Sequence, residues 1–245
     1  MHENYENPQL MNPAHSLDLP ALNEKLEHAS TPEILAWAWD TFGPKIASSS
    51  SFQTQSVPLI HLISQTCPDM PIVFLDTGFH FSETLTFRNQ LESAYNLNIM
   101  NIYPMVDKSQ LFYQYGEGLY RSDPDLCCHI NKVEPMQRSV EGFEAWISGV
   151  RRDQTKHRAG LRVLEEQSNG PLRVHPMLRW TKKEVWAYID KHDLPSHPLF
   201  EQGYTSIGCA PCTRPVFSEE DEREGRWGGA IKTECGLHLD IKRET

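Results

Sequence analysis

The feature that most constrains the fold of this chain is the alternation of short apolar runs with longer amphipathic stretches. We expect buried strands at 45–49, 72–76, 98–103, 145–150 and 174–177. Helices are predicted between and around them, at 19–27, 31–41, 54–65, 82–95, 132–140 and 181–192. Apolar strands separated by helices are typical of a mostly parallel sheet with helices on both faces, the α/β class.

Composition and charge narrow the possible roles. The chain has 245 residues, of which 39% are hydrophobic and 23% charged, a balance typical of globular proteins. Its apolar runs fall well short of the about 20 residues that span a bilayer. The first ten residues are polar, so we see no secretory signal and expect a cytoplasmic protein without a membrane partner. A formal net charge of −10 argues against a nucleic-acid partner.

The texture of the sequence suggests three regions. Residues 1–30 form an N-terminal tail and helix, and residues 31–205 form the α/β domain. Residues 206–245 are rich in glycine and charge, with little apolar periodicity. We therefore expect this last region to be a flexible C-terminal tail that contributes little to the core. Long irregular segments of this kind are usually functional.

Polar side chains follow two of the predicted strands. Ser48, Ser49 and Ser50 stand between a strand and a helix, where hydroxyls and free N–H groups can hold a phosphate. A solvated loop that caps the helix is an equally good interpretation. The run Leu75 to Gly78 ends the next strand, at the same rim of the sheet, and by itself indicates only a turn.

A run of cations follows the fourth predicted strand. Arg151, Arg152, Lys156 and Arg158 come directly after Gly149. Such clusters are usually solvated surface charge. Their position at a strand's carboxyl end, in an acidic chain, favours an anion clamp.

The six cysteines are clustered rather than spread as a disulfide framework. Cys127–Cys128 and Cys209–Cys212 together offer four soft ligands for zinc or an iron–sulfur cluster. Adjacent cysteines are unusual for zinc. A redox dithiol or buried apolar thiols are the alternatives, and Cys67 is interpreted as a packing thiol.

The C-terminal tail carries a further candidate nucleophile. Cys235 is followed by glycine and, three residues on, by His238, and a thiolate there would be reactive. An incidental exposed thiol is the alternative. Arg223 and Arg226 are spaced to share one face of a helical turn.

Together these motifs resemble the assimilatory sulfonucleotide reductases, which act on adenosine 5'-phosphosulfate (APS) or its 3'-phosphorylated form (PAPS). The similarity runs from about residue 32 to residue 238. It is carried by SSSF, LDTG, CC with NKVEP, GVRRDQ, GCAPCTRP, EREGRW and ECGLH. The resemblance implies an adenine-nucleotide α-hydrolase-like fold, so that residues 31–205 form a nucleotide-binding domain.

The resemblance also implies roles for individual residues. Cys127, Cys128, Cys209 and Cys212 match the ligands of a [4Fe–4S] cluster, and Lys132 matches a lysine between cluster and substrate. Cys235 matches the nucleophile, and Arg223, Arg226 and His238 match groups that surround the phosphosulfate. The residues expected to line or support the nucleotide site are Ser48, Ser49, Ser50, Phe52, Leu75, Thr77, Gly149, Arg151, Arg152 and Arg158.

The implied activity is thioredoxin-dependent reduction of APS to sulfite and AMP, through an S-sulfocysteine at Cys235, in sulfate assimilation and cysteine biosynthesis. Thioredoxin or glutaredoxin is the implied reductant, and a homo-oligomer is possible. The four-cysteine set favours APS, whereas Asn131 and the run INKVEPM resemble the cluster-free PAPS enzymes, so PAPS is the alternative substrate.

An ATP pyrophosphatase fits less well because serines replace the glycines of its SGGxDS loop. A zinc-stabilised nucleotide-binding module would give the ECGLH tail no purpose.

Overall fold

The computed structural model describes residues 17–168, 170–216, 223–227 and 236–237. Six strands form one sheet in the order β3-β2-β1-β4-β6-β5. Their bounds are β1 Ile46–Ser49, β2 Pro71–Leu75, β3 Asn98–Ile102, β4 Ala145–Ser148, β5 Leu164–Glu165 and β6 Leu172–Val174. All neighbouring pairs are parallel except β5 with β6, which are antiparallel at the edge. The α/β class predicted from the sequence is thereby confirmed.

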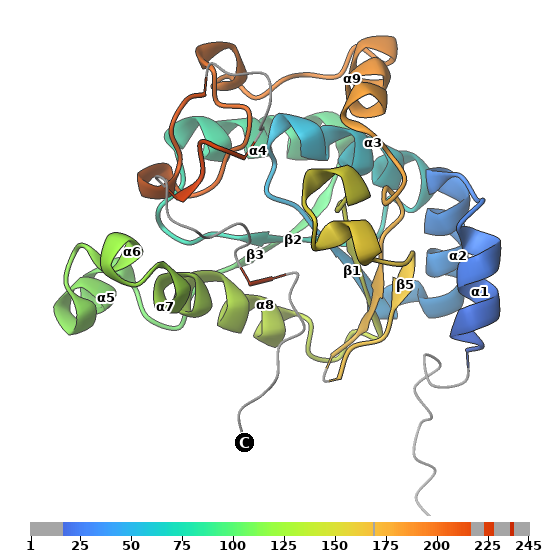
Figure 1. The fold of residues 1–245 in the computed structure, drawn as a ribbon, viewed down its shortest axis with the longest axis horizontal. Helices are drawn as coiled ribbons and strands as arrows, with labels where there is room; N and C mark the ends of the chain where they lie inside the picture. Colours follow the sequence, from blue (N-terminus) through green and yellow to red (C-terminus); the bar gives the residue numbers. More distant parts are fainter. Residues whose placement is uncertain (1–16, 169, 217–222, 228–235, 238–245) are drawn as a thin grey trace, which may run out of the picture.

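Helices cover both faces of this sheet (Figure 1). One layer holds α1 (Leu19–Leu26), α2 (Thr31–Phe42), α3 (Val57–Thr66), α4 (Ser82–Tyr95) and α9 (Lys182–Lys191). The other holds α5 (Lys108–Tyr115), α6 (Leu119–Ser122), α7 (Pro124–Cys128) and α8 (Glu134–Ser139). No helix in these described ranges is long and apolar enough to cross a membrane.

Alternation along each strand divides the core between the two layers. Ile46, Ile72 and Ile147 pack toward α2 and α3 in the larger cluster. Their neighbours Ala47 and Val73 pack toward α8 in a smaller one. Because successive side chains point to opposite faces, each strand of this covered sheet is apolar on both sides.

Several predicted elements needed correction. The strand expected at 174–177 lies earlier, at Leu172–Val174, where it pairs with Ala145–Ile147 of β4. The helix expected at 132–140 is the end of a longer helical run that begins at α7 and passes through a π-helical turn, His129–Val133. The helix α5 was not predicted because Leu111 is its one buried residue, so apolar periodicity is weak there.

The expectation that residues from 206 onward contribute little to the core is wrong for their described part. Ile207, Val216 and Trp227 are each less than a tenth exposed. Glycines allow this irregular chain to pack: a Cβ on Gly208 would lie 2.2 Å from a guanidinium nitrogen of Arg226, and one on Gly225 would lie 2.3 Å from the Arg214 carbonyl oxygen. Close packing in this segment therefore depends on glycines, which let other groups approach the backbone, and not on an apolar periodicity.

Candidate active site

A cavity of about 190 Å³, here called the main cavity because most of the predicted site residues line it, opens at the carboxyl ends of β1, β2 and β4. Its wall includes Ser48 to Ser51, Leu75 and Gly149. The strand β1 lies between β2 and β4. The strands β2 and β3 follow on one side of it, and the later strands β4, β6 and β5 lie on the other side, so the strand order reverses at β1. Ligands of open α/β sheets bind at such a reversal of strand order.

The serine loop after β1 is held in shape by its own hydrogen bonds. The Phe52 N–H donates to Ser50 Oγ at 3.0 Å, and Phe52 adopts a left-handed φ of 52°. Its ring is fully buried, edge-on to Phe74 with centroids 5.5 Å apart. Phe52 therefore anchors the loop from the core and does not line the cavity, while Ser48, Ser49 and Ser50 do.

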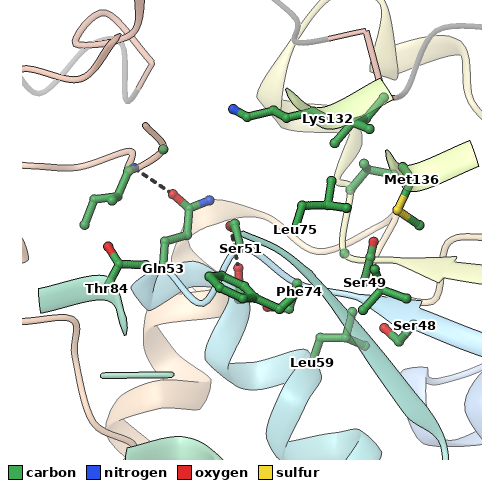
Figure 2. Close-up of a pocket in the computed structure, with 18 of the residues that line it drawn as sticks. Ser48, Ser49, Ser51, Gln53, Leu59, Phe74, Leu75, Thr84, Lys132 and Met136 are labelled. Carbon is green, nitrogen blue, oxygen red and sulfur yellow. Dashed lines mark hydrogen bonds between the residues drawn. The ribbon is translucent and has the colours of Figure 1, made fainter. Parts of the chain in front are cut away.

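The loop is also tied to the C-terminal region. The Ile207 N–H donates to Gln53 Oε1 at 2.9 Å, and Ser51 Oγ lies 3.4 Å from Ser56 Oγ (Figure 2). Figure 2 shows Lys132 and Met136 facing this loop from the opposite wall. The cavity thus lies between the β1 loop and the helical run that contains Lys132 and Met136.

Leu75 and Thr77 of the LDTG motif lie in different surroundings. Leu75 lines the cavity. Thr77 is 3% exposed and lies away from that lining. Its hydroxyl accepts the Phe79 N–H at 3.2 Å and lies 3.4 Å from Cys209 Sγ. Thr77 therefore contacts Cys209 and does not line the main cavity.

The arginines of the third motif also point in different directions. Arg158 lines the cavity and bonds Gln154. Arg151 is 2% exposed and donates to Asp153 at 2.9 Å and to Gln55 at 2.6 Å, which braces the loop behind the site. Arg152 lies outside the cavity.

The partner of Arg152 is Glu27, the residue that caps the end of α1. The Arg152 guanidinium donates to both carboxylate oxygens of Glu27, at 2.5 and 2.9 Å, and to the Leu161 carbonyl. This pair fastens the N-terminal helix to the domain and holds the pKa of Glu27 below its usual value. Arg152 can support the site only indirectly.

All four paired cysteines meet at one narrow cavity, here called the thiol cavity. Cys127 and Cys128 end α7, Cys209 precedes the short turn Ala210–Cys212, and Cys212 is the last residue of that turn. The four are free thiols. Burial raises the pKa of Cys127 to about 11. Burial also acts on Cys209, but Lys132, the Thr77 hydroxyl and Arg226 outweigh it and lower that pKa.

Lys132 connects the two cavities because it lines both. It hydrogen-bonds the Cys209 thiol from the π-helical turn that follows the cysteine pair. In the same turn Asn131 Nδ2 donates to the Cys127 carbonyl at 2.8 Å and lies 3.6 Å from Cys127 Sγ. Such π turns are frequent at functional sites.

Arg223 and Arg226 line the main cavity from the C-terminal region. Their guanidiniums lie over the Trp227 ring, 5.4 and 4.8 Å from its centroid. Arg226 donates to the Ile207 carbonyl at 3.3 Å, and its Nε is buried with no hydrogen-bond partner among the described residues. With Lys132 and Arg158, four cationic side chains converge on one cavity, an arrangement that suits an anion.

The two described residues of the ECGLH motif, Gly236 and Leu237, lie near the same cavity. Gly236 has a φ of +87°, and a Cβ there would lie 3.2 Å from Val133 Cγ2. Leu237 packs on Met136, Val140 and Trp146 and lines the main cavity. Cys235 and His238, the other predicted tail residues, lie outside the described residues.

Several lining residues were not predicted from the sequence: Gln53, His80, Thr84, Gln154, Ile207, Trp227 and Leu237. Trp227 and Leu237 stand inside the EREGRW and ECGLH motifs, so proximity to a motif was a usable signal. His80 and Thr84 carried none. Burial lowers the pKa of His80, whose Nε2 donates to the Leu75 carbonyl at 2.8 Å.

The four thiols lie at the same cavity. Among the described residues, no group of three or more His, Cys, Asp or Glu side chains is arranged to hold one metal ion.

Comparison with known proteins places these features in context. Residues 45–215 match the phosphoadenosine phosphosulfate reductase domain. An adenosine 5'-phosphosulfate reductase of Streptomyces coelicolor is 40% identical over 226 residues, covering 90% of this chain and 95% of the relative. The crystal structure of a PAPS reductase from Candida auris, a phosphate complex, superposes with a TM-score of 0.71 at 30% identity, over 81% of this chain and 96% of that one.

A more distant likeness concerns the fold alone. An FMN adenylyltransferase of Candida glabrata superposes with a TM-score of 0.55 at 18% identity, covering 80% of this chain and 66% of that chain.

Proposed function

The chain belongs to the phosphoadenosine phosphosulfate reductase family, and from this premise we propose that it reduces APS to sulfite and AMP. One observation carries the proposal: four cations from three segments of the chain converge on a cavity at the end of β1, in a chain of net charge −10. The alternative substrate is PAPS, the substrate in the name of the Candida auris neighbour.

The cavity suits a nucleotide with an anionic end. The serine hydroxyls and Arg158 bind the phosphate side, and Leu75 and Gly149 border the nucleoside. Arg223, Arg226 and Lys132 face the sulfate. Guanidiniums and ammoniums bind phosphate and sulfate oxygens through charge-assisted hydrogen bonds, which are stronger than neutral ones.

The chemistry is nucleophilic attack at sulfur by Cys235. The thiolate forms an S–S bond to the sulfate sulfur, the S–O bond to the phosphate breaks, and AMP leaves with that electron pair. Thiolate and substrate are both anionic, so the surrounding cations offset their repulsion and stabilise charge moving onto the leaving phosphate. The same cations favour the thiolate form of Cys235.

A dithiol completes the turnover. One thiolate of reduced thioredoxin or glutaredoxin attacks Cys235 Sγ, which releases sulfite and leaves a mixed disulfide. The second thiol of the reductant resolves that disulfide, restores the Cys235 thiolate and leaves the reductant oxidised. The two electrons that reduce the sulfur therefore come from the reductant's thiols.

We further propose a [4Fe–4S] cluster held by Cys127, Cys128, Cys209 and Cys212. Four soft thiols at one buried cavity are the donors such clusters take. The Asn131 amide, the Thr77 hydroxyl and Lys132 supply hydrogen bonds and charge that stabilise thiolate ligands. When bound, the cluster supplies a fixed charge beside Lys132.

The decisive experiment is incubation with APS in the absence of reductant. We expect one sulfo group to be added to the peptide that contains Cys235, detected by mass spectrometry, and AMP to be released in equal amount. The Cys235→Ser variant is the matched control and should give neither product. Unmodified Cys235 in the wild type after complete exposure to APS would refute the mechanism.

Substrate and cofactor are tested separately. We expect a higher kcat/KM for APS than for PAPS, and the reverse order would assign the protein to the alternative substrate. Purified protein should contain iron and acid-labile sulfide, and Cys127→Ser should lose both. A colourless protein that contains zinc would rule out the cluster without touching the sulfo-transfer chemistry.

A further inference from the structure

Trp146 occupies an unusual position for a core residue, because its indole N–H reaches the anion-binding loop. It is 4% exposed, and its Nε1 donates to Ser49 Oγ at 2.8 Å. We propose that Trp146 is a positioning residue, which fixes the Ser49 hydroxyl so that it donates to the anionic group of the substrate. This inference rests on the proposed function, since it concerns the same cavity.

The register of the sheet explains how the indole reaches that far. Trp146 of β4 lies directly opposite Ala47 of β1, and Ser49 is two residues further along β1 on the same face. The alanine leaves room for the bulky ring to lie along β1 toward its carboxyl end. A larger side chain at Ala47, which is fully buried, would block that path.

The hydrogen bond determines what the serine can offer a ligand. A serine hydroxyl has one proton and two lone pairs. When the indole N–H, a donor only, occupies a lone pair, the hydroxyl cannot turn that lone pair into the cavity. Its proton then remains to donate to an acceptor among the cavity contents, such as a phosphate oxygen. An unconstrained hydroxyl would have to give up rotational freedom on binding.

The ring of Trp146 also lies beside a cation and within an apolar cluster. Arg173, opposite Trp146 on β6, places its guanidinium 4.8 Å from the indole centroid. A cation over the ring withdraws electron density and strengthens the N–H as a donor. Leu237 of the tail packs in the same apolar cluster. Trp146 thus links the tail contact to the anion loop through one rigid side chain.

The test compares two tryptophans that make the same bond in different places. Trp180 Nε1 also donates to a hydroxyl at 2.8 Å, that of Thr31, on the α2 side of the molecule. Trp146→Phe and Trp180→Phe are made in the Cys235→Ser protein, which binds APS without turnover, and the Kd for APS is measured by calorimetry. We expect Trp146→Phe to raise Kd by about three- to tenfold, the range for one hydrogen bond, and Trp180→Phe to leave it unchanged.

A double-mutant comparison separates positioning from a general packing effect. Ser49→Ala removes the hydroxyl that Trp146 orients, so Trp146→Phe should raise Kd no further in the Ser49→Ala background. An equal rise in both backgrounds would overturn the proposal, as would an unchanged Kd for Trp146→Phe in the serine background. Cys235→Ser protein that fails to bind APS at all would instead overturn the proposed function.

If the Trp146→Phe variant does not fold, an isosteric replacement of the Trp146 side chain is used instead. Replacing the indole of Trp146 by a benzothiophene, in which sulfur takes the place of the N–H, keeps the shape and the contact with Arg173. The same rise in Kd is expected, and an unchanged Kd would refute the role of the N–H.

Discussion

Two buried histidines should make the stability of the domain fall steeply between pH 8 and pH 5. His175 and His197 are at most 1% exposed. Burial lowers the pKa of His175 to about 3, helped by Arg173 and Arg158, and burial lowers the pKa of His197 to about 4. The His197 ring accepts the Leu199 N–H at Nδ1, at 3.2 Å, so a proton on that nitrogen would also break a hydrogen bond.

The sign follows from the direction of the shift. Both folded-state pKa values lie below the unfolded value of about 6.5, so the unfolded chain takes up protons first as pH falls. The stability is fully present above pH 6.5 and is lost as pH decreases toward the folded-state values. Between pH 8 and pH 5 each histidine costs about 2 kcal/mol, and the pair costs about 4 kcal/mol. That is a large part of the about 5–15 kcal/mol of a typical domain.

Urea unfolding at pH 8 and pH 5 measures this loss. His197→Asn removes the titrating group and should reduce the pH-dependent loss by about 2 kcal/mol, although the variant is less stable at pH 8. Thr84→Val is the matched control, because it removes the 3.0 Å contact of Thr84 Oγ1 with His197 Nε2 and keeps the imidazole. It should be destabilised at both pH values and keep the full pH dependence. Equal losses in the wild type and in His197→Asn would refute the reasoning.

Three further changes probe the catalytic region. Lys132→Met should slow sulfo transfer to Cys235 by about 100-fold in single-turnover mass spectrometry, because in the proposed mechanism the Lys132 ammonium stabilises charge at the sulfate; an unchanged rate would exclude that role. Gly236→Ala should slow the same step by about five- to thirtyfold, since a left-handed φ costs other residues about 1–2 kcal/mol. Gly43→Ala, which has a positive φ and open space around it, should lower stability without changing the rate, and equal slowing in both would point to a general effect. Leu237→Ala should slow the transfer and Leu237→Ile should largely restore it, whereas two equally slow variants would speak against an apolar contact.

The sequence predicted the sheet well because burial on both faces leaves a strong local signature. Strands such as 72–76 and helices such as 82–95 agree with the structure to within about one residue. The helices α5 to α7 were not predicted, because each buries only one or two residues and is stabilised at its ends by caps. Asp107, for example, accepts the Gln110 N–H at 2.8 Å, a signal too common to predict a helix by itself.

Side-chain direction in the loops was beyond sequence reasoning. Arg151 and Arg152 are neighbours of the same chemical type, yet one braces Gln55 beneath the serine loop and the other binds Glu27 on α1. The partner that draws Arg152 away lies 125 positions earlier in the chain. Phe52 is likewise turned into the core by a positive φ that no local rule for phenylalanine anticipates.

The charge of the site shows why global composition misleads at a cavity. The chain is acidic overall, yet Lys132, Arg158, Arg223 and Arg226 reach the same cavity from three regions of the sequence. Arg158 and Arg226 are no more than 9% exposed, so water screens them poorly. Bringing like charges together in a poorly hydrated cavity is costly, and an anion that binds among them offsets part of that cost. The arrangement therefore suits an anionic ligand. The surplus of acidic residues elsewhere in the chain does not change the positive charge of the side chains that line this cavity.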